Sequence, residues 1–324
     1  MYLRYIYTLA SRHNIRHKVD VLLSTLAIFV PDESNAMIGI FDSGEGGLSV
    51  LKEITRLLPD EKYIYYSDNA HCPYGDKTPE YITGRCRAIT DELVRRGADI
   101  IVVACNTATA AAISTLREEY SDREKVLALS GGRRERISFI GMEPAVKPAA
   151  LGTRTGIIGV LATAGTLKGS KYLTTKGSYE DNCRISERVG KGFVELVEEG
   201  KTEGPEAERI VRESLQPLLD EGADTIVLGC THYPFLLDTM KKIAGKDIRF
   251  IDPAPAVARH LIYVMVQDRL LDEHSASEVL ARLVYGDVPG NKKNIGLPEK
   301  PDVELLSSGD PAPLRRVFNS IYKA

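Results

Sequence analysis

The chain has 324 residues, of which 43% are apolar and 27% are charged, a composition typical of a soluble globular protein with one large domain or two ordinary ones. The net charge is −3 and no long run of Lys and Arg occurs, so we expect no nucleic-acid partner. No apolar stretch reaches the roughly 18–20 residues that span a bilayer, so we expect no membrane partner. Five cysteines without a C-x-x-C spacing argue against a disulfide framework or a zinc ribbon and favour free thiols in a reducing cytosol.

Residues 1–36 do not match the rest of the chain. Basic residues precede an apolar run over 21–30, and Ser-Asn-Ala directly precedes Met37. This pattern is compatible with a signal peptide, with the remnant of an expression tag, or with an upstream start that adds a dispensable tail. Pro-Asp-Glu at 31–33 and the cytosolic character of the remainder weigh against export. We therefore expect a tail outside the fold and a functional beginning at Met37.

From Met37 onward, short β-branched runs alternate with longer helical patterns, which predicts parallel sheets covered by helices on both faces. The expected strands cover residues 37–41, 63–67, 99–104, 138–141, 156–161, 224–229 and 248–251. The expected helices cover residues 47–58, 79–97, 107–119, 205–221, 234–244 and 254–270.

One pattern occurs twice in the chain at an offset of 125 residues. Residues 97–107 read GADIIVVACNT and residues 222–232 read GADTIVLGCTH, with six of eleven positions identical. A weaker echo relates residues 38–43 to residues 158–163 at an offset of 120. The near-equal offsets predict two α/β lobes of similar build.

Cys105 and Cys230 occupy equivalent positions of this repeat, each after a buried strand and before a predicted helix. Ligands of open α/β sheets bind at the carboxyl ends of the strands, so two facing lobes would bring one thiol to each side of a shared cleft. Racemisation needs a base on one face of a carbon and an acid on the other, and two exchangeable thiols can supply both. A packed structural cysteine explains either residue alone, but not the matched pair.

Each of these thiols needs help to ionise near neutral pH, because a free thiol has a pKa of about 8.5. Both precede a predicted helix N-terminus, where free N–H groups favour an anion. We assign Asp42, at the end of the first strand, to Cys105, and we assign His232 to Cys230, two residues before it. The other cysteines lack such a context and are interpreted as structural: Cys72, Cys86 and Cys183.

Two glycine-containing loops are further candidates. Residues 42–47 read DSGEGG at a strand-to-helix turn, and the absence of a following Gly-Lys-Ser/Thr excludes a Walker loop. Such a turn could offer backbone N–H groups to a small carboxylate, and a plain turn capped by Asp42 explains the motif equally well. Residues 71–75 read HCPYG, which could line or gate a cleft, although a bare turn is the commoner meaning.

Four motifs together resemble those of glutamate racemases, in order and in spacing. They are FDSGEGGLSV at 41–50, CPYG at 72–75, CNTAT at 105–109 and GCTHYP at 229–234. The resemblance, within the aspartate/glutamate racemase superfamily, covers roughly residues 37–320. It implies an α/β fold of two pseudo-symmetric flavodoxin-like lobes, each a mainly parallel sheet flanked by helices, with the active site in the cleft between them.

The resemblance also implies how the chain divides. Residues 37–130 and 254–324 are expected to form the first lobe, and residues 131–253 the second. Two segments depart from the family pattern, namely the tail over 1–36 and the stretch around 126–136, which we interpret as an extra loop between the lobes.

The implied activity is racemisation of L- and D-glutamate without pyridoxal phosphate, another cofactor or a metal. Cys105 would take the proton from D-glutamate and Cys230 from L-glutamate, with Asp42 and His232 as their partners. Substrate contacts are implied for Asp42, Ser43, Tyr74, Gly75, Asn106, Thr107, Thr231 and His232. The product would feed peptidoglycan synthesis in a bacterial cytoplasm. Glutamate is the expected small-molecule partner, and the resemblance leaves open whether the chain forms a homodimer.

Three other functions compete with this interpretation. An aspartate racemase of the same superfamily would share the cysteine pair, but it usually carries Glu at the position of His232 and differs at Asp42-Ser43-Gly44. A two-lobed binding protein would explain the repeated plan and the cleft, but not the matched thiols. A thiol oxidoreductase is disfavoured by the absence of C-x-x-C.

Overall fold

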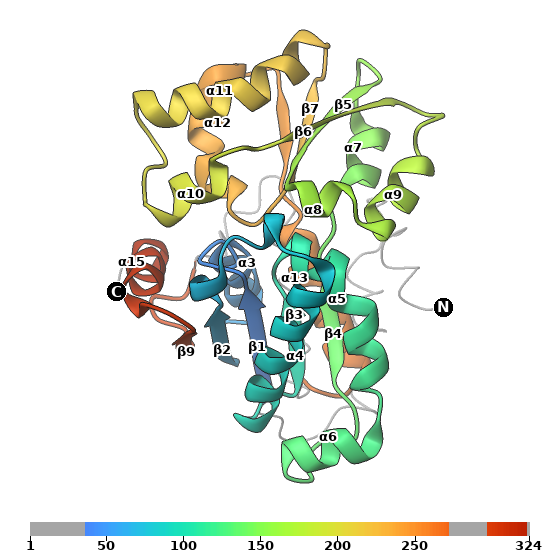
Figure 1. Ribbon diagram of the computed structural model, residues 1–324, viewed down its shortest axis with the longest axis vertical. Helices are drawn as coiled ribbons and strands as arrows, with labels where there is room; N and C mark the ends of the chain where they lie inside the picture. The colour runs from blue at the N-terminus through green and yellow to red at the C-terminus, as the bar shows by residue number, and fades with distance from the viewer. Residues whose placement is uncertain (1–35, 272–296, 323–324) are drawn as a thin grey trace, which may run out of the picture.

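The computed structural model describes residues 36–271 and 297–322, which form two α/β lobes that face each other along the long axis of the molecule (Figure 1). The tail expected over residues 1–36 lies outside the described residues, except for the buried Ala36. No helix in the described ranges is long and apolar enough to cross a membrane.

The first lobe is built on a parallel sheet with the strand order β4-β3-β1-β2-β9. These strands are β1 (Met37–Asp42), β2 (Lys62–Ser67), β3 (Ile100–Val103), β4 (Ser138–Gly141) and β9 (Asp302–Ser307). Phe41 pairs with Val103 in the register of β1 and β3. That register brings the carboxyl ends of the two central strands to the same edge of the sheet.

The second lobe repeats this plan with the parallel order β6-β5-β7-β8. Its strands are β5 (Ile157–Ala162), β6 (Arg184–Val189), β7 (Thr225–Gly229) and β8 (Arg249–Ile251). The sequence β3-β1-β2 in one sheet corresponds to β7-β5-β6 in the other. The predicted pair of similar α/β lobes is therefore confirmed.

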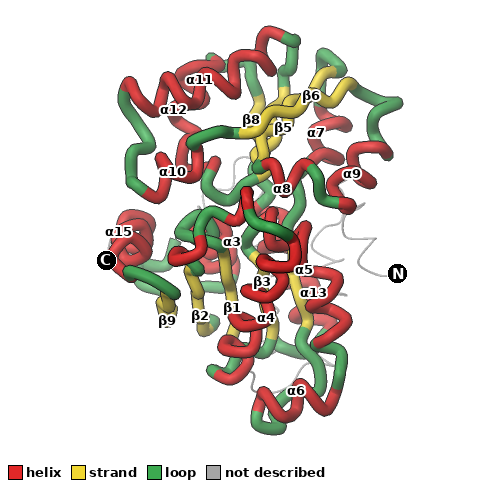
Figure 2. Tube along the Cα trace, viewed as in Figure 1, coloured by secondary structure: helices red, strands yellow, loops and turns green. Residues whose placement is uncertain are grey.

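Helices cover both faces of each sheet (Figure 2). Around the first sheet lie α3 (Leu48–Leu57), α4 (Pro79–Arg95), α5 (Asn106–Glu119), α6 (Arg123–Ser130), α13 (Ala254–Gln267) and α15 (Pro311–Tyr322). Around the second lie α7 (Val146–Gly152), α8 (Ala164–Leu167), α9 (Ser170–Gly177), α10 (Phe193–Glu198), α11 (Pro205–Asp220) and α12 (Leu237–Ala244). Short 3₁₀ turns are η1 (Asn69–His71), η2 (Tyr74–Asp76) and η3 (Tyr233–Leu236).

The cores explain why the strands are apolar at nearly every position. Successive residues of a strand point to opposite faces, and here both faces are covered. Ile100 and Val102 of β3 join the core beneath α3 and α13, whereas Ile101 and Val103 join the core beneath α4 and α5. The second lobe likewise has one core on each face of its sheet.

The expected lobe boundary at residue 131 is wrong for β4. This strand pairs in parallel with β3, with Val102 opposite Ile140, so it belongs to the first sheet. The chain therefore enters the second lobe only after Gly141. The strand was assigned to the second lobe because its sequence is apolar and carries no signal that identifies the sheet it joins.

The stretch 126–136 is not a loop between the lobes. Its first part belongs to α6, which begins after Asp122, whose side chain accepts the Lys125 N–H at 3.0 Å, and which ends at Gly131 with φ +63°. Figure 1 shows α6 at the end of the first lobe farthest from the second. A capping aspartate and a left-handed glycine delimit this helix, as is common at helix ends.

The end of the chain completes the first lobe. After β8, α13 crosses back and packs against α3 and β4. Further on, β9 pairs with β2 at the edge of the first sheet, and α15 packs against β9 and α3. The first lobe is thus built from both ends of the described chain, and the second lobe is inserted between them.

Candidate active site

The predicted catalytic side chains meet between the lobes, at the carboxyl ends of the central strands. Asp42 ends β1, Cys105 follows β3, and Cys230 directly follows β7. Thr231, beside Cys230, donates its hydroxyl to Asp42 Oδ2 at 3.1 Å, so the two lobes are in direct contact here. Both thiols are nearly buried, with 5% of Cys105 and 7% of Cys230 exposed.

Cys105 lies at the N-terminus of α5, as expected. Its sulfur accepts the Ala108 N–H at 3.4 Å, and its thiol donates to Ser43 Oγ at 3.8 Å. Burial raises the pKa of the Cys105 thiol well above its ordinary value, and the nearby charges of Asp42 and Cys230 raise it further, against the opposing effect of the Ala108 N–H. In this closed arrangement Cys105 is therefore a protonated thiol.

Asp42 is fixed by several donors. Oδ1 accepts the Ser43 N–H at 2.7 Å, and Oδ2 accepts the Gly47 N–H at 2.6 Å in addition to the Thr231 hydroxyl. Burial nevertheless raises the pKa of Asp42, and the positive charge of His232 only partly offsets this effect. A buried carboxyl with a raised pKa is better able to accept a proton than an exposed one.

The sequence suggested that the glycine-rich turn over 42–47 could offer its backbone N–H groups to a small carboxylate ligand. In the structure, three of these N–H groups are bound to side chains of the protein. The N–H groups of Ser43 and Gly47 bind Asp42, and that of Glu45 binds Glu198 Oε1 at 3.0 Å. The glycines serve a different purpose, which is close approach of the second lobe. A Cβ atom at Gly46 would lie 2.3 Å from His232 Nδ1, so any other residue here would displace the imidazole.

The chain after Cys230 differs from the expectation of a helix from residue 234. A 3₁₀ turn, η3, comes first, and α12 begins only at Leu237. Pro234 has no N–H to bond back to the Cys230 carbonyl, as an α-helix would require, and Tyr233 instead donates to that carbonyl at 3.1 Å. Cys230 therefore does not precede an α-helix N-terminus.

His232 supplies the local charge at Cys230 instead. Its Nδ1 lies 3.7 Å from Cys230 Sγ, and its Nε2 lies 2.5 Å from Glu198 Oε1. Burial lowers the pKa of His232, but hydrogen bonds with Cys230, Cys72 and Glu198 outweigh this effect and raise the pKa well above its ordinary value. The ring is therefore a buried imidazolium between a thiol and a carboxylate.

Glu198 is a residue of the site that the sequence does not reveal. It ends α10 and accepts both from His232 Nε2 and from the Glu45 N–H, so it joins the second lobe to the glycine-rich turn of the first. Its sequence context over 195–201, ELVEEGK, is indistinguishable from a solvated helix end. Only the folded structure brings it to His232, 34 residues away.

Tyr74 and Gly75 lie in η2, beside α8 of the second lobe. The Tyr74 hydroxyl donates to Asp68 Oδ2 at 2.5 Å, and Arg85 pairs with Asp68 at 2.7 Å, so this hydroxyl is already engaged within the protein. A Cβ at Gly75 would lie 3.5 Å from Thr163 Cβ. The loop therefore faces the second lobe through its backbone.

Asn106 and Thr107 begin α5 next to Cys105. Asn106 is 3% exposed, and neither its amide nitrogen nor its amide oxygen has a hydrogen-bond partner among the described residues. Leaving a buried polar group unpaired costs about 1–3 kcal/mol, so this amide is suited to a polar ligand. Thr107 Oγ1 lies 2.8 Å from Thr163 Oγ1, which lies 2.9 Å from Thr166 Oγ1. These two threonines of the second lobe were not identified from the sequence.

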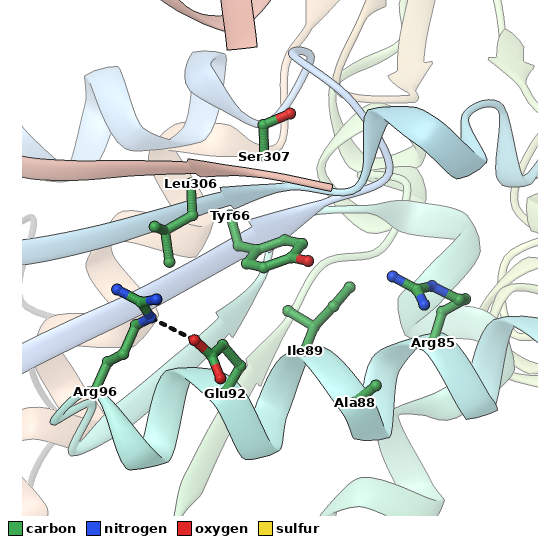
Figure 3. Close-up of a pocket in the computed structure, with 8 residues that line it drawn as sticks. All are labelled: Tyr66, Arg85, Ala88, Ile89, Glu92, Arg96, Leu306 and Ser307. Atoms are coloured by element: carbon green, nitrogen blue, oxygen red, sulfur yellow. Dashed lines mark hydrogen bonds and ion pairs between the residues drawn. The ribbon is translucent and has the colours of Figure 1, made fainter. Parts of the chain in front are cut away.

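A cavity of about 370 Å³ lies elsewhere, between α4 and the β2–β9 edge of the first sheet (Figure 3). It is lined by Tyr66, Arg85, Ala88, Ile89, Glu92, Arg96, Leu306 and Ser307. Its arginines are already paired, Arg96 with Glu92 at 2.6 Å and Arg85 with Asp68. The lining contains no cysteine, so the cavity is separate from the thiol site.

Known proteins resemble this chain in sequence and in fold. The sequence signature of the family described as Asp/Glu/Hydantoin racemase matches residues 38–261. A glutamate racemase of Stutzerimonas stutzeri (strain A1501) is 44% identical over 243 residues, which are 75% of this chain and 87% of that protein.

Two crystal structures have a similar fold over most of their length. One is glutamate racemase from Francisella tularensis subsp. tularensis SCHU S4 in complex with D-glutamate, with a TM-score of 0.64, 26% identity, and coverage of 90% of this chain and 94% of that one. The other is Escherichia coli glutamate racemase in complex with L-glutamate and the activator UDP-MurNAc-ala, with a TM-score of 0.65, 30% identity, and coverage of 84% and 98%.

Proposed function

The chain belongs to the Asp/Glu/Hydantoin racemase family, and we propose that it interconverts L- and D-glutamate by a two-base thiol mechanism without a cofactor. The observation that carries this proposal is the pair Cys105 and Cys230. They come from equivalent positions of two similar lobes, approach one buried space, and each has an ionisable neighbour. The relatives named glutamate racemase, and their complexes with D- and L-glutamate, support glutamate as the substrate.

In the direction from D- to L-glutamate, Cys105 is the base. Its proton passes first to Asp42, whose raised pKa makes the carboxyl a competent acceptor. The thiolate then removes the proton from Cα, and the Cys230 thiol delivers its own proton to the opposite face. The reaction ends with a thiol at Cys105, a thiolate at Cys230 and the first proton on Asp42, so the number of protons is conserved.

In the opposite direction, Cys230 is the base. His232 lies 3.7 Å from its sulfur and, as an imidazolium, stabilises the thiolate electrostatically. Glu198 positions the imidazole through Nε2 and compensates its charge. Glu198 is therefore a positioning residue, whereas the two cysteines exchange protons with the substrate.

The substrate is held by neutral polar groups close to the thiols. Asn106 has the strongest structural support, because its buried amide has both a donor and an acceptor unused. Ser43 brings its hydroxyl to Cys105, Thr231 brings its hydroxyl to Asp42, and Thr107 and the backbone of Gly75 lie where the first lobe meets Thr163 of the second. Asp42 and His232 contribute through their charges. A dicarboxylate can be bound by several such donors, each contributing about 0.5–1.5 kcal/mol.

Cytoplasmic location and supply of D-glutamate for peptidoglycan belong to the same proposal. The chemistry requires reduced cysteines, and all five cysteines are free in the structure. This favours a reducing compartment, in which a cell-wall precursor would be made before export.

The decisive experiment uses the purified chain with no added cofactor. L-glutamate and L-aspartate are incubated separately and followed by optical rotation, and glutamate is expected to racemise far faster. The glutamate reaction is then repeated in D₂O. Because the delivering thiol exchanges with solvent, D-glutamate formed in the first turnovers should carry deuterium at Cα. Inverted product without deuterium would rule out the two-base scheme, and faster aspartate turnover would reassign the substrate.

A further inference from the structure

A third cysteine reaches the same histidine as Cys230. The sulfur of Cys72, a ring nitrogen of His232 and a carboxylate oxygen of Glu198 all lie within 4.8 Å of one another. They come from three separate elements, namely the end of η1, the turn after β7 and the end of α10. Cys72 was interpreted from the sequence as structural, yet it is only partly buried and its sulfur faces the polar groups of the site.

The packing around this cluster is built on a glycine. A Cβ at Gly44 would lie 3.1 Å from Cys72 Sγ and 2.2 Å from Glu198 Oε1, so only a glycine allows both side chains to converge here. The side chain of Glu198 is 21% exposed and that of His232 is 2% exposed, so the carboxylate has more room to move than the imidazole.

The donor set indicates which ligand would bind. A thiolate, an imidazole and a carboxylate are the ligands that Zn²⁺ uses in proteins, at about 2.0–2.3 Å and with tetrahedral geometry. Such bonds bring neighbouring donor atoms to about 3.2–3.8 Å of one another, which a rotation of Glu198 and a small shift of Cys72 can achieve. Hard cations such as Mg²⁺ prefer oxygen ligands, so the sulfur selects against them.

We propose that Cys72, His232 and Glu198 form a binding site for Zn²⁺, and that occupation of this site inhibits the racemase. The fourth position belongs to water or to Cys230, whose sulfur already lies 3.7 Å from His232. The bound cation would withdraw the imidazole and its carboxylate from Cys230. The inhibition rests on the proposed function, whereas the binding does not.

Only one side of the reaction centre has this capacity. The surroundings of Cys105 offer a thiol, the Asp42 carboxylate and the Ser43 hydroxyl, but no imidazole within hydrogen-bond distance of the sulfur among the described residues. Zinc should therefore act on the half of the site that contains His232. A cell that needs the enzyme active would have to keep free zinc below the dissociation constant of this site.

Binding is tested on the full chain with Co²⁺ as a spectroscopic probe and Zn²⁺ as competitor. Wild-type protein should show thiolate-to-cobalt charge-transfer absorption that Zn²⁺ abolishes. Cys72→Ser should weaken binding at least about tenfold, while the matched control Cys183→Ser, a cysteine in a separate core, should bind as wild type. Cys72→Ala serves the same purpose if the Ser variant does not fold. Unchanged binding in both Cys72 variants, or none in wild type, would refute the site.

Inhibition is tested separately by the racemase assay. Zn²⁺ should inhibit wild type, EDTA should restore activity, and Mg²⁺ should have no effect. Cys72→Ser should racemise glutamate in the absence of metal but lose sensitivity to Zn²⁺ by tenfold or more. A Cys72→Ser enzyme as sensitive as wild type would show that zinc acts elsewhere. If the chain bound Co²⁺ through Cys72 but did not racemise glutamate, the site would stand and the proposed function would fall.

Discussion

The two halves of the site begin with the same sequence pattern and acquire opposite electrostatic surroundings. Cys105 caps an α-helix and lies near the carboxyl of Asp42, which disfavours its thiolate. Cys230 precedes a 3₁₀ turn, and its sulfur lies 3.7 Å from Nδ1 of the cationic His232 ring. The repeat therefore conserves the position of the thiol and varies the group that controls its charge.

The partners come from different places in the two lobes. In the first, Asp42 ends the neighbouring strand β1; the corresponding residue of β5 is Ala162, which carries no charge. In the second, His232 stands two residues after the cysteine; the corresponding residue of the first lobe is Thr107. Each lobe thus retains one ionisable partner, at a position that the other lobe fills with a neutral residue.

Outside the reacting centre the lobes remain alike. Asp99 and Asp224 directly precede the equivalent strands β3 and β7, and each binds the backbone at or just before the first strand of its lobe, β1 or β5. Asp99 accepts the Met37 N–H at 3.0 Å, and Asp224 accepts the Arg154 N–H at 2.6 Å. Structural roles were thus preserved in this repeat while the chemical roles diverged.

Removal of either thiol should have the largest effect. Cys105→Ala and Cys230→Ala should each lower kcat/KM by about 10²–10⁴-fold, because each removes the group that serves one face of the carbon. Cys183→Ser is the matched control and should remain within a few-fold of wild type. The measurement is initial racemisation rate, with circular dichroism to verify folding. Near-normal turnover by either Ala variant would mean that the two thiols are not equivalent bases.

The pairing of each thiol with its partner can be separated by isotope effects. Asp42→Asn and His232→Asn should both slow the reaction, but the ratio of kcat/KM for the two enantiomers must remain one, because they have equal free energy. Weakening Cys105 through Asp42 should raise the primary isotope effect on kcat/KM for Cα-deuterated D-glutamate and not for the L form. His232→Asn should show the opposite bias. Identical shifts for both enantiomers in both variants would reduce Asp42 and His232 to general electrostatic roles.

Glu198→Gln should have a smaller effect on the same half of the site. The amide keeps the size of the side chain but weakens one of the hydrogen bonds that, with those of Cys230 and Cys72, raise the pKa of His232, so we expect a loss of about tenfold in kcat/KM. The rise in isotope effect should be confined to L-glutamate. Glu199→Gln, the exposed neighbour, is the control and should behave as wild type. Equal effects on the isotope effects of both enantiomers would argue for a merely structural role of Glu198.

Substitution of Asp99 or of Asp224, which have the same role in the two lobes, should affect stability alone. Asp99→Asn and Asp224→Asn should each lower the free energy of unfolding by about 1.5–3 kcal/mol, the value of hydrogen bonds to a charged group. The free energy of unfolding of each variant would be measured by urea unfolding and compared with that of wild type. A loss of stability in only one of the two variants would show that the two aspartates do not share the anchoring role.

For Asp224 the loss should depend on pH. Burial opposes ionisation, but hydrogen bonds from Thr153, Arg154 and Thr155 outweigh it and hold the pKa of Asp224 below its usual value. A depressed pKa contributes stability that is fully present above the unfolded value, near 3.9, and is lost as pH falls through the folded value. The difference between wild type and Asp224→Asn should therefore shrink as pH is lowered from 7 towards 3. A difference that is constant over this range would contradict the assignment.

Much of the site could be predicted from the sequence because its signals are local. Cys105, Cys230 and His232 lie within a repeated strand-to-turn pattern, and Asp42 ends a strand whose neighbour could be inferred. Glu198 could not be found this way, because its partner is 34 residues distant and its own surroundings resemble a solvated helix end.

The same limit explains the errors in the fold. The strand β4 has an apolar sequence that fits either sheet, and only its pairing with β3 assigns it. The α6 helix is short, and the arginines that follow it suggest a solvated loop. In the structure Arg133 and Arg134 instead bind Asp99, at 3.2 and 2.8 Å, which fixes the segment against the first lobe. Long-range pairing of this kind leaves no periodic trace in the sequence.

The hydrogen bonds between the lobes link the motion of the enzyme to its chemistry. Thiols that are 5% and 7% exposed cannot receive glutamate until the lobes separate. Separation of the lobes breaks the hydrogen bond from the Thr231 hydroxyl to Asp42 and the one from the Glu45 N–H to Glu198. Asp42 is the proposed partner of Cys105, and Glu198 binds the histidine beside Cys230. The same opening that admits the substrate would therefore also free both carboxylates from the opposite lobe.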